Sequence, residues 1–132
     1  MNWSITPELV VAFASEWIEA WNARDLDRIL KHYARDVVFT SPFVCRILGR
    51  NQNTVRGIAE RRVYFSRALN AYPDLHFVAG RVYSGAQSLV IEYQSVEGRL
   101  AAEMMEFNEA GLIVRVRAHY AAADSAEGVR GR

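Results

Sequence analysis

The sequence is short of cysteine and of lysine, and both shortages bear on its chemistry. Cys45 is the only cysteine in 132 residues, so no intrachain disulfide can form, which fits a reducing compartment. No histidine lies near Cys45 in sequence, so this thiol is more typical of a small packed side chain than of a catalytic nucleophile. Lys31 is the only lysine, and the other basic residues are arginines, which favour planar, bidentate ion pairs.

An excess of charge of one sign is also missing, and so is a long apolar run. The 16 Lys and Arg residues nearly balance 15 Asp and Glu residues, and a formal net charge of +1 gives no reason to expect binding to nucleic acid or to an acidic membrane. No apolar segment approaches the roughly 20 residues that span a bilayer, and Glu8 and Glu16 interrupt the apolar run that a secretory signal would need. We therefore expect a cytoplasmic protein with no nucleic-acid or membrane partner.

Helical patterns dominate the first half of the sequence. A capping residue, a proline and an acidic residue, Thr6-Pro7-Glu8, open a helix that is predicted over residues 7–23. Asp25 caps a second, shorter helix. A third helix is predicted over residues 58–71, because Pro73 disfavours helix in the residue before it.

Alternating patterns dominate the second half. A strand is predicted over residues 36–41, and residues 43–48 suit either a short strand or an irregular flap. Four further strands joined by short turns are predicted over residues 75–83, 88–95, 100–107 and 112–120. Helices on one side of an antiparallel sheet predict a single α+β domain over residues 1–121, with a pocket between sheet and helices. The small and polar residues 122–132 predict a flexible tail.

A carboxylate stands on an apolar strand face near the end of this domain. Alternation along residues 100–107 places Glu103 beside Met105 and Phe107, and no cationic residue of the strand shares that face. A buried carboxylate must be protonated, paired or used. Glu103 is therefore the main candidate for a functional group.

Five motifs carry a family resemblance and together cover almost the whole chain. They lie at residues 21–27, 33–43, 56–57, 72–77 and 106–113. They resemble the nuclear transport factor 2-like superfamily, in particular its SnoaL-like and ketosteroid-isomerase-like members. The resemblance implies a cone-shaped fold of three N-terminal helices packed on a strongly curved, mostly antiparallel sheet. Because that fold hosts enzymes of several kinds and also non-enzymes, it implies no single activity.

The resemblance also places three functional positions of the ketosteroid isomerases on this chain. Their aspartate base corresponds to Ser41, their tyrosine donor on the first helix to Trp17, and their protonated aspartate donor to Glu103. The acid is therefore kept, whereas the base and the tyrosine are replaced. A serine is too weak a base to take a proton from carbon unaided, so ketosteroid isomerisation itself is not expected.

Three further side chains each have a functional and a structural interpretation. Arg61, on the third helix, could pair with Glu103 or bind a ligand anion, or it could be solvated like most helical charges. His32 could point inward as a base in place of the missing aspartate, or it could be half-buried and structural. Trp17 could form an aromatic wall with its indole N–H as a weak donor, or simply pack in the core.

We expect the pocket to be largely apolar and to hold a small apolar or aromatic molecule. No metal or cofactor is predicted, because the three histidines lack the spacing of metal ligands. Arg61 is predicted to contact the ligand. By alternation and resemblance, the predicted lining consists of Trp17, Val37, Phe39, Ser41, Phe65, Leu89, Ile91, Tyr93, Glu103, Met105, Val116, Ala118 and Tyr120.

The outward face of the last strands mixes apolar and charged residues. Arg115, Arg117 and His119 are predicted to lie there, beside Met104 and Glu106 of the preceding strand. Such a face suits a homodimer formed sheet to sheet, although a solvated face of an antiparallel sheet has the same pattern.

Three functions remain open at this point. The first is a small-molecule-binding protein in which Glu103 and Arg61 neutralise each other. The second is a SnoaL-like isomerase, cyclase or dehydratase in which Glu103 acts as general acid or base, helped by His32, Ser41 or Tyr93. The third is a dimerisation module whose core is filled and has no pocket.

Overall fold

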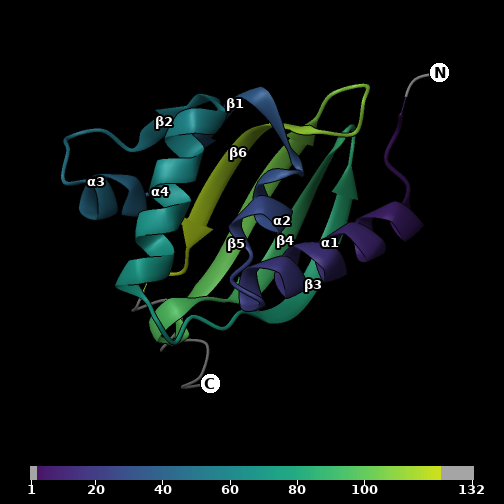
Figure 1. Ribbon diagram of the computed structural model, residues 1–132. Coiled ribbons are helices and arrows are strands. Elements are labelled where there is room, and N and C mark those ends of the chain that lie inside the picture. Colours follow the sequence, from purple (N-terminus) through teal and green to yellow (C-terminus); the bar gives the residue numbers. More distant parts are fainter. Residues whose placement is uncertain (1–2, 123–132) are drawn as a thin grey trace.

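The computed structural model describes residues 3–122 and shows helices packed against a curved six-stranded sheet (Figure 1). The predicted flexible tail lies beyond Ala122, outside the described residues. The helices are α1 (Pro7–Asn22), α2 (Leu26–Leu30), α3 (Phe43–Leu48) and α4 (Gly57–Ala71), with a 3-10 turn η1 (Val96–Gly98). The strands are β1 (Tyr33–Thr40), β2 (Thr54–Arg56), β3 (Val78–Gly85), β4 (Ser88–Gln94), β5 (Leu100–Phe107) and β6 (Ile113–Tyr120).

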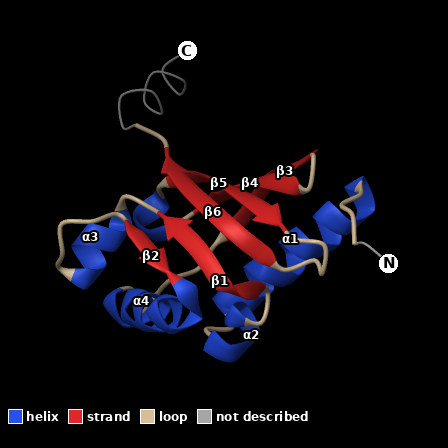
Figure 2. Cartoon of the chain, turned by 90° about the horizontal axis from the view of Figure 1, so that it is seen from above, coloured by secondary structure: helices blue, strands red, loops and turns tan. Residues whose placement is uncertain are grey.

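The sheet is open and runs in the order β2-β1-β6-β5-β4-β3. Strand β1 pairs with β6 in parallel, whereas every other neighbouring pair is antiparallel. Register shifts interrupt the β1–β6, β3–β4 and β5–β6 pairings, and such irregularities bend a sheet. Helices α1, α2 and α4 lie together on one side of the sheet (Figure 2). The predicted α+β fold is confirmed.

The predicted helix signals act as expected at the ends of α1 and α2. Thr6 Oγ1 accepts a hydrogen bond from the backbone N–H of Leu9, and the Asp25 carboxylate accepts one from the N–H of Arg28, both at 3.2 Å. The inward stripe of α1 includes Trp17 and Trp21, both of which are buried. Across residues 3–122, no helix is both long and apolar enough to cross a lipid bilayer.

Residues 43–48 form a helix, so the predicted strand or flap is wrong there. The hydroxyl oxygen of Ser41 accepts a hydrogen bond from the Phe43 N–H at 3.2 Å, which helps to start α3 after Pro42. Gly49 ends the helix with a left-handed backbone (φ 65°), which glycine adopts without strain. An apolar run of six residues is too short for its period to separate helix from strand.

The sheet also differs from the prediction at both of its edges. The three-residue strand β2 lies outside every predicted strand, and it pairs antiparallel with the end of β1. Strand β3 begins at Val78 instead of residue 75. The side chain of Asn22 binds the backbone of Phe77 on both sides, donating to its carbonyl at 2.9 Å and accepting from its N–H at 2.6 Å. This side chain takes the place of a neighbouring strand.

Alternation along β5 is as predicted. Glu103, Met105 and Phe107 are buried, whereas Met104 and Glu106 are only partly buried on the other face. Pairing with both neighbours fixes this orientation, because Glu103 lies opposite Ile91 of β4 and Ala118 of β6. The sheet thereby carries a carboxylate into the core.

Candidate functional site

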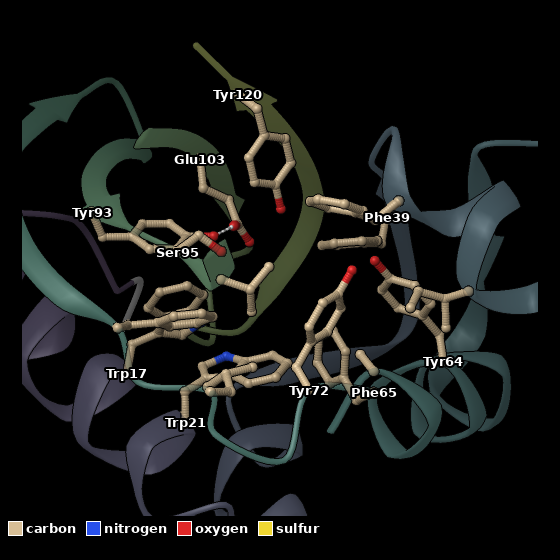
Figure 3. A pocket seen from close by; sticks show the side chains of 16 residues that line it. Trp17, Trp21, Phe39, Tyr64, Phe65, Tyr72, Tyr93, Ser95, Glu103 and Tyr120 are labelled. Carbon is tan, nitrogen blue, oxygen red and sulfur yellow. Dashed lines mark hydrogen bonds between the residues drawn. The ribbon is translucent and has the colours of Figure 1, made fainter. Parts of the chain in front are cut away.

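A cavity of about 50 Å³ lies between the end of the sheet and helices α1, α3 and α4 (Figure 3). Its volume is enough for a few water molecules. Aromatic rings form most of its wall, and Glu103 is its only acidic residue. The lining residues are Trp17, Trp21, Phe39, Phe43, Ile47, Tyr64, Phe65, Ala68, Tyr72, Leu75, Phe77, Tyr93, Ser95, Val96, Glu103 and Tyr120.

Glu103 is 4% exposed and is held by one tyrosine. The Tyr93 hydroxyl donates a hydrogen bond to Glu103 Oε1 at 2.6 Å (Figure 3). Burial raises the pKa of Glu103 above its ordinary 4.5, while the hydrogen bond from Tyr93 and the charge of Arg61 act in the opposite direction. Within the described chain no cationic group lies within 4 Å of this carboxylate, so it has no ion-pair partner there.

Tyrosine hydroxyls supply most of the other polar groups of the cavity. Figure 3 shows the side chains of Tyr64 and Tyr120 directed toward its centre, from α4 and β6 respectively. Burial raises the pKa of Tyr64, Tyr93 and Tyr120, and the nearby Glu103 carboxylate contributes in the same direction. All three hydroxyls therefore stay protonated at neutral pH. Tyr93 already donates its proton to Glu103, and Tyr64 and Tyr120 each carry a further O–H donor.

Arg61 lies behind this wall and is fully buried, so the interpretation of a solvated arginine is wrong. Its guanidinium carbon is 3.9 Å from the ring centroids of Phe39 and Phe65, and 4.2 Å from that of Tyr33. Burial lowers the pKa of Arg61 to about 10, opposed by Tyr33 and Glu103, so the group is still a cation at neutral pH. Arg61 does not line the cavity, and the predicted ion pair with Glu103 is absent at 4 Å.

Two predicted catalytic residues lie outside the cavity. His32 does not point inward, since its Nε2 is 3.4 Å from Glu16 Oε2 and its ring packs edge-on against Phe13. Ser41 is fully buried but does not line the cavity, and its hydroxyl oxygen accepts the Phe43 N–H. The prediction that His32 replaces the missing base is therefore wrong in position.

Six of the predicted lining residues do line the cavity, namely Trp17, Phe39, Phe65, Tyr93, Glu103 and Tyr120. A second group is buried in the core beneath it instead, namely Val37, Leu89, Ile91, Met105, Val116 and Ala118. Strand alternation identifies the inward face correctly. It does not tell which part of that face is covered by packed side chains and which part is left open.

The sequence prediction missed the part of the wall that comes from helices and connections. On α4, Tyr64 and Ala68 are one helical turn apart, and Tyr72 follows at the same spacing just after the helix. This i, i+4 line was available as a signal. Phe43 and Ile47 could not be assigned to the wall from such spacing, because they lie on α3, which was not predicted to be a helix.

No residues suited to a metal are brought together in residues 3–122, since no group of three or more His, Cys, Asp or Glu side chains is gathered there. The cavity's polar groups are one carboxylate, tyrosine hydroxyls, one serine hydroxyl and the indole N–H of Trp21, which has no hydrogen-bond partner in the described part of the chain. This set can hold the polar end of a small organic molecule by hydrogen bonds, and Glu103 can give or take one proton.

Comparison with known proteins places this geometry in a family context. The family model for the SnoaL-like domain matches residues 14–124. A SnoaL-like protein of unknown function from Burkholderia thailandensis is 39% identical, with a TM-score of 0.85 over 91% of this chain and 100% of that chain. No functionally curated protein is detectably similar in sequence.

More distant structures share the fold alone. A proposed ketosteroid isomerase from Kribbella flavida is 19% identical, with a TM-score of 0.68 over 88% of this chain and 80% of that chain. A proposed isomerase of the SnoaL-like family from Agrobacterium tumefaciens is 15% identical, with a TM-score of 0.69 over 86% of this chain and 97% of that chain.

Proposed function

The chain belongs to the SnoaL-like domain family, and from that membership we propose that it binds a small, flat, mostly apolar molecule in the cavity beside Glu103. The aromatic wall contacts the body of the ligand, and Glu103 with the neighbouring hydroxyls holds its polar end.

The proposal rests on the Glu103 carboxyl group, which faces the cavity with one oxygen that has no hydrogen-bond partner in the described part of the chain. Oε1 accepts from Tyr93, whereas Oε2 receives no hydrogen bond from any residue in the described part of the chain. The same side chain lines the cavity, and burial raises its pKa toward the neutral form. A neutral carboxyl group would offer one O–H donor to a ligand carbonyl or hydroxyl, which is the polar contact that an apolar pocket needs for orientation.

A second candidate is enzymatic, and one observation favours it. Glu103 is a buried carboxyl group with a raised pKa and no cation within ion-pair distance, which is typical of a general acid or base. In that case the protein is an isomerase, cyclase or dehydratase that moves one proton at Glu103. His32 takes no part, because it lies against Glu16 outside the cavity.

The predicted homodimer belongs with these proposals. Arg115, Arg117 and His119 are exposed on the outer face of β6, and Arg115 lies 3.6 Å from Glu106 of β5. A second copy could cover this face. The dimerisation module without a pocket becomes the better proposal if the cavity accepts no ligand.

The binding proposal is tested by filling the cavity. Ala68→Leu adds three carbon atoms to the wall, and Ala59→Leu makes the same change at an exposed position of the same helix. We expect wild type and Ala59→Leu to bind benzamide or acetophenone in calorimetric titrations, and Ala68→Leu to lose about tenfold or more in affinity. Wild type that binds neither compound would overturn the proposal.

The enzymatic candidate has a separate test. Exchange of the methyl protons of acetophenone with D2O, followed by NMR, reports proton transfer at carbon without knowledge of the natural substrate. We expect catalysed exchange by wild type and its loss in Glu103→Gln. Exchange by wild type no faster than in buffer would exclude this activity toward simple ketones while leaving binding intact.

A further inference from the structure

We propose that the natural ligand is an anion, a small aromatic carboxylate, and that Arg61 is the residue that recognises its charge. This inference deepens the proposed function and rests on it.

Arg61 has a hydrogen-bonding demand that its surroundings do not meet. It is 0% exposed, and within the described part of the chain its Nε, Nη1 and Nη2 atoms make no hydrogen bond of good geometry; the neutral Tyr33 hydroxyl is the one nearby oxygen that interacts with it. A guanidinium carries five N–H donors, and buried cations are ordinarily paired because each unmet donor is costly. Its counterpart is therefore missing from the surroundings of this side chain.

The three aromatic rings around Arg61 do not replace that counterpart. The faces of Tyr33, Phe39 and Phe65 attract the positive charge at 3.9–4.2 Å. Only the Tyr33 hydroxyl among these rings can accept a hydrogen bond from an N–H. It accepts from Trp17 and also interacts with Arg61, but one neutral oxygen cannot satisfy a guanidinium with five N–H donors. The rings hold the cation in place and leave its N–H edge for a planar acceptor, for which a carboxylate is the matching shape.

The position of Arg61 connects it to the proposed ligand cavity. Phe39 and Phe65 each contact the guanidinium and each line the cavity, so one layer of rings separates the two. The cavity is small, and a single-ring ligand requires a wall side chain to move. Rotation of the Phe65 ring, or of the Arg61 side chain past it, would enlarge the cavity and bring the guanidinium to its surface in one step.

Glu103 makes the anion acceptable instead of repelling it. The titratable groups that face Glu103 are Tyr93 from β4, Tyr120 from β6, Tyr64 and Arg61 from α4, and Tyr33 from β1. The tyrosines stay neutral and Arg61 stays charged at neutral pH, so Glu103 is the group among these whose charge can change when an anion binds. A carboxylate bound beside it favours the protonated form, which can donate to the ligand. Binding should therefore take up a proton.

The experiment compares benzoate with benzamide, which has nearly the same shape and no charge. Both are titrated calorimetrically into wild type, Arg61→Met, Arg61→Lys and the control Arg62→Met at pH 7, in two buffers of different ionisation enthalpy. Arg62 is the matched control because it is an exposed neighbour, paired with Asp27 at 2.7 Å. We expect wild type and Arg62→Met to prefer benzoate by about tenfold or more, with proton uptake.

The variants separate recognition of charge from binding of the ring. Arg61→Met should keep benzamide affinity and lose the preference for benzoate, whereas Arg61→Lys should retain part of it. Equal affinities of wild type for the two compounds, without proton uptake, would overturn the inference and leave the proposed function standing, and water would then satisfy Arg61. If wild type binds neither compound, the proposed function fails as well. Because the wild-type comparison needs no variant, poor folding of Arg61→Met would not weaken the test.

Discussion

The indole N–H of Trp17 donates a hydrogen bond to the hydroxyl oxygen of Tyr33 at 3.0 Å, and both side chains are buried. Trp17 stands where the family resemblance places a tyrosine that donates to the ligand. Here the donor is directed to β1 instead of into the cavity. Trp17 therefore contributes a wall, stacked on Phe77 and edge-on to Tyr93, and leaves hydrogen bonding to other residues.

The hydrogen bond between Trp17 and Tyr33 predicts that Tyr33→Phe destabilises the folded protein. The ring that packs against Arg61 is kept, while the acceptor for the buried Trp17 N–H is lost. We expect the free energy of unfolding to fall by about 1–3 kcal/mol, the usual cost of an unsatisfied buried donor. Urea denaturation followed by tryptophan fluorescence measures it.

Tyr83→Phe is the matched control for this measurement. Tyr83 also loses a hydrogen bond, to Glu92 at 2.6 Å, but on an exposed surface where water replaces the lost partner. Its effect should stay within about 0.5 kcal/mol. Equal decreases in the free energy of unfolding of the two variants would show that the buried Trp17–Tyr33 hydrogen bond stabilises the protein no more than the exposed one.

Glu103 predicts a pH dependence of stability with a definite sign. Its pKa in the folded protein is raised above 4.5, first by burial, so the folded state holds this proton more tightly than the unfolded state. Stability from this group is fully present below pH 4.5 and is lost as the pH rises through the folded pKa. Glu103→Gln cannot ionise, so it does not lose this stability. Between pH 4.5 and the folded pKa of Glu103, the free energy of unfolding of the variant should therefore rise relative to wild type by up to about 1.4 kcal/mol per pH unit.

Urea denaturation of both proteins between pH 4 and pH 9 measures this difference. Glu106→Gln is the control, because Glu106 lies on the same strand but on the partly exposed face beside Arg115. A stability difference between wild type and Glu103→Gln that does not change with pH would contradict the raised pKa.

Glu16 predicts the opposite behaviour in acid. Its carboxylate accepts from Arg28 Nε at 2.8 Å and Nη2 at 2.6 Å, and these bonds are the main reason that the pKa of Glu16 is lowered to about 2. The stabilisation is present above the ordinary pKa of 4.5 and is lost as the pH falls toward 2. The pair is about one-third exposed, so solvent screening keeps the effect small.

Glu16→Gln should therefore lower the Tm at pH 7 by roughly 2–4 °C and leave it nearly unchanged close to pH 2. Glu19→Gln is the control from the same helix, since Glu19 is 68% exposed and lies 3.9 Å from Arg28. Calorimetric scans at several pH values check both. A Tm difference that persists at pH 2 would exclude the ion pair as its cause.

Much of the fold follows from patterns that need no tertiary information. The capped start of α1 and the alternation of β5 are local signals, and both gave correct elements. Helix α3 and strand β2 did not follow in this way, because six apolar residues and three mixed ones carry no decisive period. The start of α3 is supported by the hydrogen bond from the Phe43 N–H to Ser41, and β2 is held by pairing with the end of β1, which periodicity alone does not reveal.

The site was less predictable than the fold, for a physical reason that Arg61 illustrates. Charged helical residues are mostly exposed, and Glu60 and Arg62 on either side of it are indeed exposed. The contrary signal was its spacing of four from Phe65 and eight from Leu69, both buried on α4. A general preference for solvent outweighed this local periodicity in the prediction, and the structure follows the periodicity.

The parallel pairing of β1 with β6 also governs how the protein is made. Residues of β6 leave the ribosome after those of β1 and β5. Until β6 is synthesised, the edges of β1 and β5 that pair with it stay without their partner. During that interval two apolar strands can pair with other chains. A stop codon that removes only the last strand would therefore produce an aggregating chain and not a shorter working domain.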